Sequence, residues 1–139
     1  MQKINQIYIK SVVKKALDED LKPRGDITTN LISFKNKKTT AKIIAKQSGV
    51  IAGLDFCKTA FKLVGKETIF ISKVKDGSKV KKNKVIAEVQ AKTKTILIAE
   101  RTALNFLNHA SGIATLTHQF IQKVNKKTKI CCTRKTTPN

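Results

Sequence analysis

Residues 68–107, TIFISKVKDGSKVKKNKVIAEVQAKTKTILIAERTALNFL, change from strand-like to helix-like spacing partway along. Thr68–Val74 is rich in β-branched and aromatic residues, which predicts a strand, and it is followed by the turn signal Asp76-Gly77. A second strand is predicted at Val85–Gln90. From Thr95 the apolar residues recur every three or four positions, which predicts a helix. The stretch therefore predicts a fold that mixes helices with strands joined by a tight connection.

The residues before this stretch predict further elements of both kinds. Apolar spacing predicts an amphipathic helix over 3–18, and alternation predicts a strand over 39–46. A second helix is expected from Leu54 to Val64, with Gly65 ending it. Between the first helix and the first strand, Asp26 is placed to cap a short turn.

The residues after 107 predict a break between two helices and then a strand. Small residues at 110–112 predict a break between the helix that starts at Thr95 and a further helix that reaches Val124. Residues 128–133, TKICCT, predict a short apolar strand.

Length and composition limit the class of protein. The chain has 139 residues, of which 40% are hydrophobic, so one compact domain with a core is expected. No apolar run approaches the roughly 18–20 residues that a membrane span needs. The N-terminus lacks the apolar stretch of a secretory signal, so we expect a cytoplasmic protein without membrane contact. Three cysteines, two of them adjacent, do not favour a disulfide framework.

The charge is strongly positive, with 29 Lys and Arg against nine Asp and Glu. A basic, non-catalytic nucleic-acid-binding module is therefore one hypothesis. All but three of the basic residues are lysines scattered along the chain, and there is no Trp, which instead favours a lysine-rich solvated surface. The three arginines, Arg24, Arg101 and Arg134, mark positions where a rigid, planar, five-donor group is needed.

Two of these arginines, Arg101 and Arg134, lie in segments that can each be interpreted in two ways. Arg101 shares a helix face with Asn105 and either pairs with Glu100 or another neighbour, or projects toward an anionic ligand. The segment Thr133–Pro138, TRKTTP, delivers two cations and hydroxyls just after an apolar strand. It is either a basic tail or a strand end of the kind on which α/β barrels place ligand groups.

Four segments resemble one known family. Glu100–Thr117, ERTALNFLNHASGIATLT, and Thr133–Pro138 are similar to the two signatures of quinolinate phosphoribosyltransferase, also called nicotinate-nucleotide pyrophosphorylase (carboxylating). Leu17–Thr29, LDEDLKPRGDITT, and Ser48–Phe56, SGVIAGLDF, resemble its N-terminal segments in the same order. The resemblance covers essentially the whole chain, and all three arginines fall inside these motifs.

The resemblance implies an α+β fold, in which an N-terminal α/β sandwich of helices on an antiparallel sheet is followed by the first helix and strand of a truncated α/β barrel. Residues 1–108 are then the sandwich and 109–139 the start of the barrel. The implied enzyme is a glycosyltransferase of de novo NAD biosynthesis. It condenses quinolinate with phosphoribosyl pyrophosphate and releases nicotinate mononucleotide, CO₂ and pyrophosphate.

The resemblance also implies a set of substrate-binding residues. Arg101 would reach a quinolinate carboxylate across a subunit interface, and Thr133, Arg134 and Lys135 would bind substrate at the end of the first barrel strand. Mg²⁺ would arrive with phosphoribosyl pyrophosphate, and no metal ligand or catalytic residue is assigned in this chain. The implied assembly is a homodimer or a multiple of dimers, without specific nucleic-acid binding.

The family's later segments, which carry a His-Arg pair, a further Lys and acidic residues for ribose and metal, do not occur in these 139 residues. We therefore expect the chain to represent the N-terminal part of such an enzyme and to be inactive alone. A related barrel phosphoribosyltransferase that acts on another pyridine or pyrimidine acid is an alternative.

Overall fold

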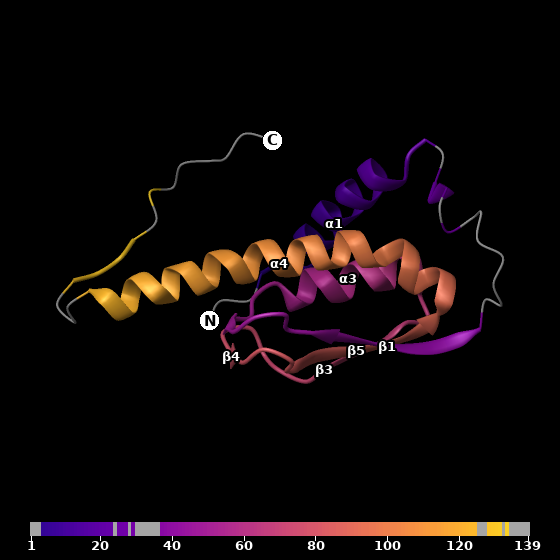
Figure 1. Ribbon diagram of the computed structural model, residues 1–139. Coiled ribbons are helices and arrows are strands. Elements are labelled where there is room, and N and C mark those ends of the chain that lie inside the picture. Colours follow the sequence, from indigo (N-terminus) through magenta and orange to yellow (C-terminus); the bar gives the residue numbers. More distant parts are fainter. Residues whose placement is uncertain are drawn as a thin grey trace.

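Two helices pack on a three-stranded antiparallel sheet, and a third helix packs on those two rather than on the sheet (Figure 1). The computed structural model describes residues 4–23, 25–27, 29, 37–124, 128–131 and 133. The predicted mixture of helices with an antiparallel sheet is confirmed.

The larger sheet has the order β1-β5-β3, formed by Lys38–Ile44, Val85–Lys92 and Ile69–Ser72. All three strands are confirmed near their predicted bounds. β3 and β5 pair directly, with Phe70 opposite Val89. The connection between them is longer than a hairpin turn because it includes β4 (Lys79–Val80), which pairs with β2 (Gly49–Val50) in a second, two-stranded sheet.

The three helices are α1 (Gln6–Leu21), α3 (Leu54–Val64) and α4 (Thr93–Lys123). In α1, Ile9, Val13 and Leu17 are spaced four apart and buried, so one stripe of the helix faces α3 and α4. Asn5 caps this helix, because its Oδ1 accepts the N–H of Ile7 at 2.8 Å. The predicted helices at 3–18 and 54–64 are confirmed.

The core lies between the sheet and the helices. α3 and α4 contact each other, and both bury small residues completely, namely Cys57, Ala60, Ala99 and Ala103. Small side chains let two helices approach closely, since the distance between helix axes depends on the residues at the contact. Phe61 and Val89 fill the same cluster from α3 and the sheet.

The predicted break at 110–112 is wrong, because α4 continues through these residues as one helix of 31 residues. A single Gly in a helix costs only about 1 kcal/mol relative to Ala, which the neighbouring turns can offset. Ala110 and Ser111 instead contact the segment around β2. The helix crosses the predicted boundary between 108 and 109, and the division into two domains there stays a prediction.

The predicted strand at 128–133 is not formed by its described residues, 128–131 and 133. A strand needs a neighbour for its main-chain N–H and C=O groups, and the described part of the chain gives this segment no pairing strand. The segment follows the end of α4, at the far end of that helix from the three-stranded sheet (Figure 1).

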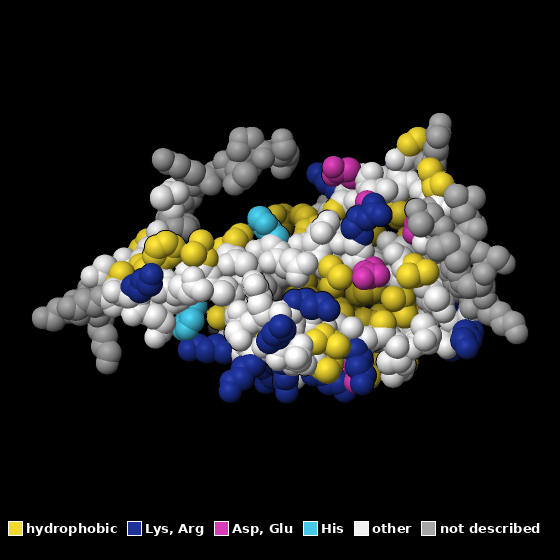
Figure 2. Space-filling model, viewed as in Figure 1, with side chains coloured by type: hydrophobic (Ala, Val, Ile, Leu, Met, Phe, Trp, Pro, Cys, Tyr) yellow, Lys and Arg dark blue, Asp and Glu magenta, His cyan; other side chains and the backbone are white. Residues whose placement is uncertain are grey.

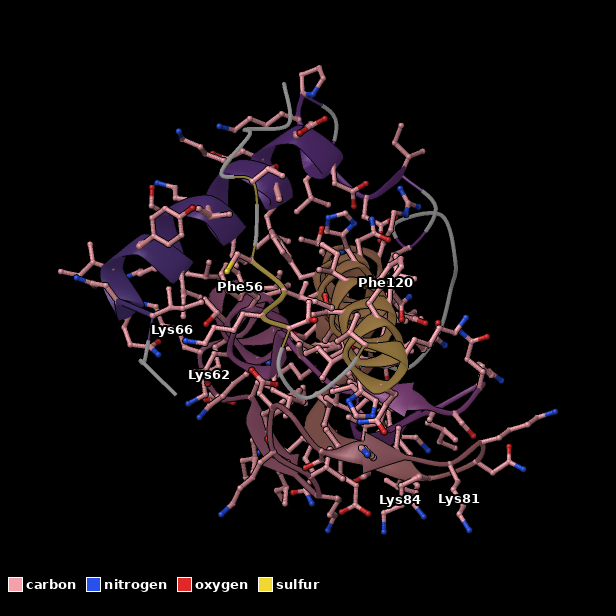
Figure 3. All side chains as sticks on the ribbon, turned by 90° about the vertical axis from the view of Figure 1, so that its left-hand side faces the viewer. Phe56, Lys62, Lys66, Lys81, Lys84 and Phe120 are labelled. Atoms are coloured by element: carbon pink, nitrogen blue, oxygen red, sulfur yellow. The ribbon has the colours of Figure 1, made fainter. Side chains whose placement is uncertain are left out.

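The C-terminal part of α4 extends past the sheet (Figure 1). It carries exposed apolar side chains, some of which Figure 2 shows in yellow. Figure 3 shows Phe120 on this part of the helix. The exposed residues are Ile113, Leu116, Phe120 and Ile121, each at least half exposed. Within the described residues, no helix has both the length and the apolar character that crossing a membrane requires.

Candidate functional site

Arg101 connects α4 to the end of α1. Its Nη1 donates a hydrogen bond to Oδ1 of Asp20 at 2.8 Å. The Arg101 side chain is 72% exposed and that of Asp20 is 23% exposed, so the carboxylate is the partly buried member of the pair. Of the two interpretations of Arg101, a pair within its own helix is wrong, because the ion pair joins two helices. The guanidinium remains open to solvent.

Asp26 is the second carboxylate near Arg101. Its Oδ1 accepts the N–H of Thr29 at 3.0 Å, and its Oδ2 accepts the Thr29 hydroxyl. The predicted capping of this turn by Asp26 is confirmed. The two hydrogen bonds from Thr29 hold the pKa of Asp26 below its ordinary value of 3.8, and the positive charges of Arg101 and Lys94 act in the same direction.

A small cleft of about 200 Å³ brings these groups together. It is lined by charged residues and by four apolar side chains, Leu21, Ile27, Leu97 and Ile98, together with Gly25. An exposed guanidinium at the mouth of a partly apolar cleft can bind the carboxylate of a flat, anionic molecule, because the planar fork matches a carboxylate in two-bond geometry.

A larger cleft of about 590 Å³ lies beside the first, also between α1 and α4. Asn105 lines it, one helical turn after Arg101, together with Glu19, Asp20 and His109. The predicted common face of Arg101 and Asn105 is therefore the face of α4 that meets α1. His109 is an exposed residue of the helix.

Of the other predicted site residues, the structure describes Thr133 and does not join it to Arg101. Thr133 is exposed, follows the end of α4, and has no hydrogen bond to Arg101. Arg134 and Lys135 lie outside the described residues. The placement of this group as substrate-binding residues stays a prediction.

Two of the family-like motifs meet along α4, which fixes the helix that carries Arg101. Ser111 accepts the N–H of Ala52 at 3.0 Å, and Thr115 accepts the N–H of Val50 at 2.9 Å. Gly49 allows this approach, because a Cβ there would stand 2.8 Å from Oγ1 of Thr115. The helix hydroxyls thus bind Val50 and Ala52 on one side of this short segment, while β4 pairs with it on the other.

Asp76 fixes the start of α3. Its two carboxylate oxygens accept the N–H groups of Gly53 and Leu54 at 3.2 and 3.1 Å. These N–H groups lack partners inside the helix, and a negative charge at a helix N-terminus also interacts favourably with the helix dipole. The sequence pattern had indicated Asp76 only as part of a turn.

The pairing of Asp20 with Arg101 was not predicted from the sequence. A signal was present, since Asp18, Glu19 and Asp20 stand at the C-terminal end of a helix, where acidic residues oppose the helix dipole. Asp18 pairs with Lys22 at 3.1 Å and Asp20 with Arg101. Two of these three acidic side chains are therefore paired with basic side chains, one just after α1 and one on α4.

The described residues contain no group of three or more His, Cys, Asp or Glu placed to hold a metal ion. Cys57 is fully buried, and burial raises the pKa of its thiol to about 12, which agrees with its interpretation as a small core residue.

Four exposed lysines, Lys62, Lys66, Lys81 and Lys84, do not form one patch. Figure 3 shows Lys62 and Lys66, at the end of α3, well apart from Lys81 and Lys84, which flank the turn before β5. All four are exposed at least in part. This distribution agrees with a lysine-rich solvated surface and gives the nucleic-acid hypothesis no focused site among these residues.

Known proteins that this chain resembles belong to one family. The family described as "Quinolinate phosphoribosyl transferase, N-terminal domain" matches residues 26–111. The chain is 41% identical over 135 residues to a probable nicotinate-nucleotide pyrophosphorylase [carboxylating] of Methanocaldococcus jannaschii, covering 94% of this chain and 46% of that protein. It is 35% identical over 136 residues to the protein of the same name in Bacillus subtilis, covering 97% and 46%.

Solved structures show the same likeness. The crystal structure of NadC from Streptococcus pyogenes is similar with a TM-score of 0.92 and 33% identity, over 100% of this chain and 50% of that one. The nicotinate-nucleotide pyrophosphorylase from Francisella tularensis is similar with a TM-score of 0.80 and 32% identity, over 86% and 42%. The chain spans about half the length of the relatives it matches.

Proposed function

Because this chain belongs to the quinolinate phosphoribosyl transferase family, we propose that it supplies the N-terminal part of an enzyme that converts quinolinate and phosphoribosyl pyrophosphate into nicotinate mononucleotide, CO₂ and pyrophosphate. The matched relatives bear names for this activity. They are about twice as long as the chain, so the proposal assigns the rest of the active site to a segment that corresponds to their remaining length.

The observation that carries this proposal is the exposed guanidinium of Arg101 beside a partly apolar cleft. Quinolinate is a planar pyridine with two adjacent carboxylates, so its site needs converging cations and a flat apolar surface. Arg101 offers the cation, and Leu97 and Ile98 offer apolar surface on the same helix. Thr133, Arg134 and Lys135 are proposed as further substrate-binding residues, from motif resemblance.

The reaction forms a bond between the pyridine nitrogen and the ribose while pyrophosphate departs. The cationic ring that results stabilises the electron pair left on the ring carbon when the adjacent carboxylate departs as CO₂, and a proton then adds to that carbon. Decarboxylation therefore relies mainly on the substrate. The role proposed for Arg101 is to bind and orient a carboxylate. Mg²⁺ is proposed to accompany phosphoribosyl pyrophosphate, with no step assigned to ligands in this chain.

The proposed assembly is a homodimer or a multiple of dimers, in which Arg101 faces substrate held by the partner subunit. The exposure of Arg101 supports this arrangement, because its guanidinium points away from its own core. Both substrates are highly charged metabolites that do not cross membranes unaided, which supports a cytoplasmic location.

The experiment is a chimera in which these residues replace the matching N-terminal part of the Bacillus subtilis relative. Folding is checked by circular dichroism and a thermal melt, and nicotinate mononucleotide and pyrophosphate are measured after addition of both substrates. We expect one product of each per quinolinate consumed. A chimera that folds but forms neither product would contradict the proposal.

The competing hypotheses make different predictions for the same protein. A related phosphoribosyltransferase would prefer a pyridine or pyrimidine acid with one carboxylate, so nicotinate and orotate are tested beside quinolinate. A nucleic-acid-binding module would bind RNA or DNA at physiological salt with sequence preference, whereas binding by scattered lysines falls steeply as salt rises.

A further inference from the structure

Among the residues that the structure describes, Arg101 is held by one atom of its guanidinium. Its Nη1 donates to Oδ1 of Asp20 at 2.8 Å, and in the described part of the chain Asp20 is its one hydrogen-bonding partner. An arginine has five N–H donors, and the edge formed by Nε and Nη2 lies opposite Nη1. That edge is the one that binds a carboxylate side-on with two parallel hydrogen bonds. Asp20 therefore holds Arg101 without using this edge, which makes no hydrogen bond to any residue that the structure describes.

Asp26 does not make the same contact. Its two carboxylate oxygens accept hydrogen bonds from Thr29, and it makes no hydrogen bond to Arg101, so it contributes a nearby negative charge only. Asp20 is also the less exposed member of the ion pair and lies in the last turn of α1. Its backbone is fixed by the helix, and the buried Leu17 lies one turn earlier.

We propose that Asp20 is a positioning residue, which orders the exposed Arg101 side chain through Nη1 and leaves its Nε–Nη2 edge to receive a carboxylate. The inference rests on the proposed function for the identity of that carboxylate, a pyridine-2,3-dicarboxylate. The ordering of Arg101 by Asp20 is a property of this chain alone and can be measured without turnover.

The two effects of Asp20 on an incoming dianion have opposite signs. Its negative charge repels the dianion, so removing that charge should tighten binding if charge alone matters. If Asp20 positions Arg101, the same change should weaken binding, because a free long side chain loses rotamer entropy when it binds. Glu19 is the matched control, since it is the exposed neighbour of Asp20 and has the same charge.

The test uses the full chain labelled with ¹⁵N. Only three arginines are present, so the Nε–Hε spectrum contains three signals, and Arg101→Lys identifies one. We expect a high heteronuclear NOE for Arg101 in the unmodified chain and in Asp20→Glu. It should fall toward the value of a free arginine in Asp20→Asn, and Glu19→Gln should leave it unchanged. An Arg101 signal that is equally mobile in the unmodified chain and in Asp20→Asn would overturn the inference.

Binding of quinolinate to the Bacillus subtilis chimera supplies the second readout, because the proposed function places part of the substrate site outside the isolated chain. We expect the dissociation constant, measured by isothermal titration calorimetry, to rise at least threefold in Asp20→Asn while it stays equal or falls in Glu19→Gln. Equal tightening in both variants would overturn the positioning role. If Arg101→Gln leaves the dissociation constant of the chimera unchanged, the proposed function fails at this residue, while the NOE comparison on the chain still decides whether Asp20 orders Arg101.

Discussion

Thr115 of α4 and Val50 of β2 are joined by a hydrogen bond of 2.9 Å from the main-chain N–H of Val50 to the Thr115 hydroxyl. One turn earlier, Ser111 makes the same contact with Ala52 at 3.0 Å. Two hydroxyls spaced four apart on a helix thus satisfy alternate residues of an extended segment. This contact holds the middle of α4 against the sandwich, and α4 also carries Arg101.

Removing these hydroxyls should destabilise the fold. Thr115→Val keeps the side-chain shape but leaves the part-buried N–H of Val50 without its acceptor, which should cost about 1–3 kcal/mol of unfolding free energy. Urea denaturation followed by circular dichroism measures the change. Thr117→Val, at an exposed position of the same helix, is the control and should change stability by less than about 0.5 kcal/mol. Equal effects of the two substitutions would contradict the proposed contact.

Alanine substitutions at Gly53 and Gly77 distinguish the cost of backbone strain from that of steric crowding. Both have a positive φ, +93° and +87°, so alanine at either position should cost about 1–2 kcal/mol. At Gly53 a Cβ would also stand 3.1 Å from Cβ of Ala110 and 3.2 Å from O of Phe106, whereas at Gly77 nothing lies within 4 Å.

We therefore expect Gly53→Ala to lower the melting temperature more than Gly77→Ala does. Differential scanning calorimetry of the two variants gives the comparison. A Gly77→Ala variant that is the less stable of the two would show that close packing of Gly53 against α4 has no energetic consequence.

Cys57 should resist thiol reagents in the folded protein. It is fully buried and its thiol pKa is about 12, so at pH 8 roughly one molecule in 10⁴ carries the thiolate. A Cys131→Ser/Cys132→Ser variant leaves Cys57 as the one thiol and is treated with Ellman's reagent. We expect no reaction over the time in which the exposed Cys131 of the unmodified chain reacts, and full reaction in 6 M guanidinium. Rapid labelling without denaturant would mean that this part of the core opens readily.

Asp26 should make stability depend on pH in the acid range. Its pKa in the folded state lies below 3.8, so its contribution is complete above the unfolded-state pKa and is lost as pH falls through the folded-state value. Asp26→Ala should therefore be less stable than the unmodified chain at pH 7, by about 1 kcal/mol as for other capping residues. The difference should shrink below about pH 4. Denaturation curves at pH 7, 5 and 3 test this, and a constant difference would contradict the assignment.

Local spacing predicted most of the elements because each of them has its own periodicity or cap. α1 buries residues four apart, and Asp26 caps its turn through a residue three positions later. The break at 110–112 was wrong for a tertiary reason. Its small residues look like a joint in the sequence, yet in the fold they make room for the segment around β2.

The site was only partly predictable for a related reason. Arg101 stood out because this chain uses arginine so rarely. Its partner Asp20 lies 81 positions away in the sequence, and a contact at that separation depends on how two helices pack. Asp76 was missed similarly, since its cap on α3 joins a loop to a helix start 22 positions earlier. The acidic end of α1 was the one local signal of such a contact.

The kinetics of the chimera with the Bacillus subtilis relative test the central claim, that Arg101 binds a carboxylate of quinolinate. Arg101→Gln is compared with Lys66→Gln, which removes the same charge from the exposed turn after α3. Loss of a charge-assisted two-bond contact costs about 1.5–3 kcal/mol, so kcat/KM for quinolinate should fall roughly 10- to 150-fold in Arg101→Gln. The KM for phosphoribosyl pyrophosphate should stay within about twofold in both variants, because neither change touches that substrate. The control Lys66→Gln should also keep the parent chimera's kcat/KM for quinolinate. An Arg101→Gln chimera that keeps the parent's kcat/KM for quinolinate, or that loses affinity only for phosphoribosyl pyrophosphate, would contradict the account.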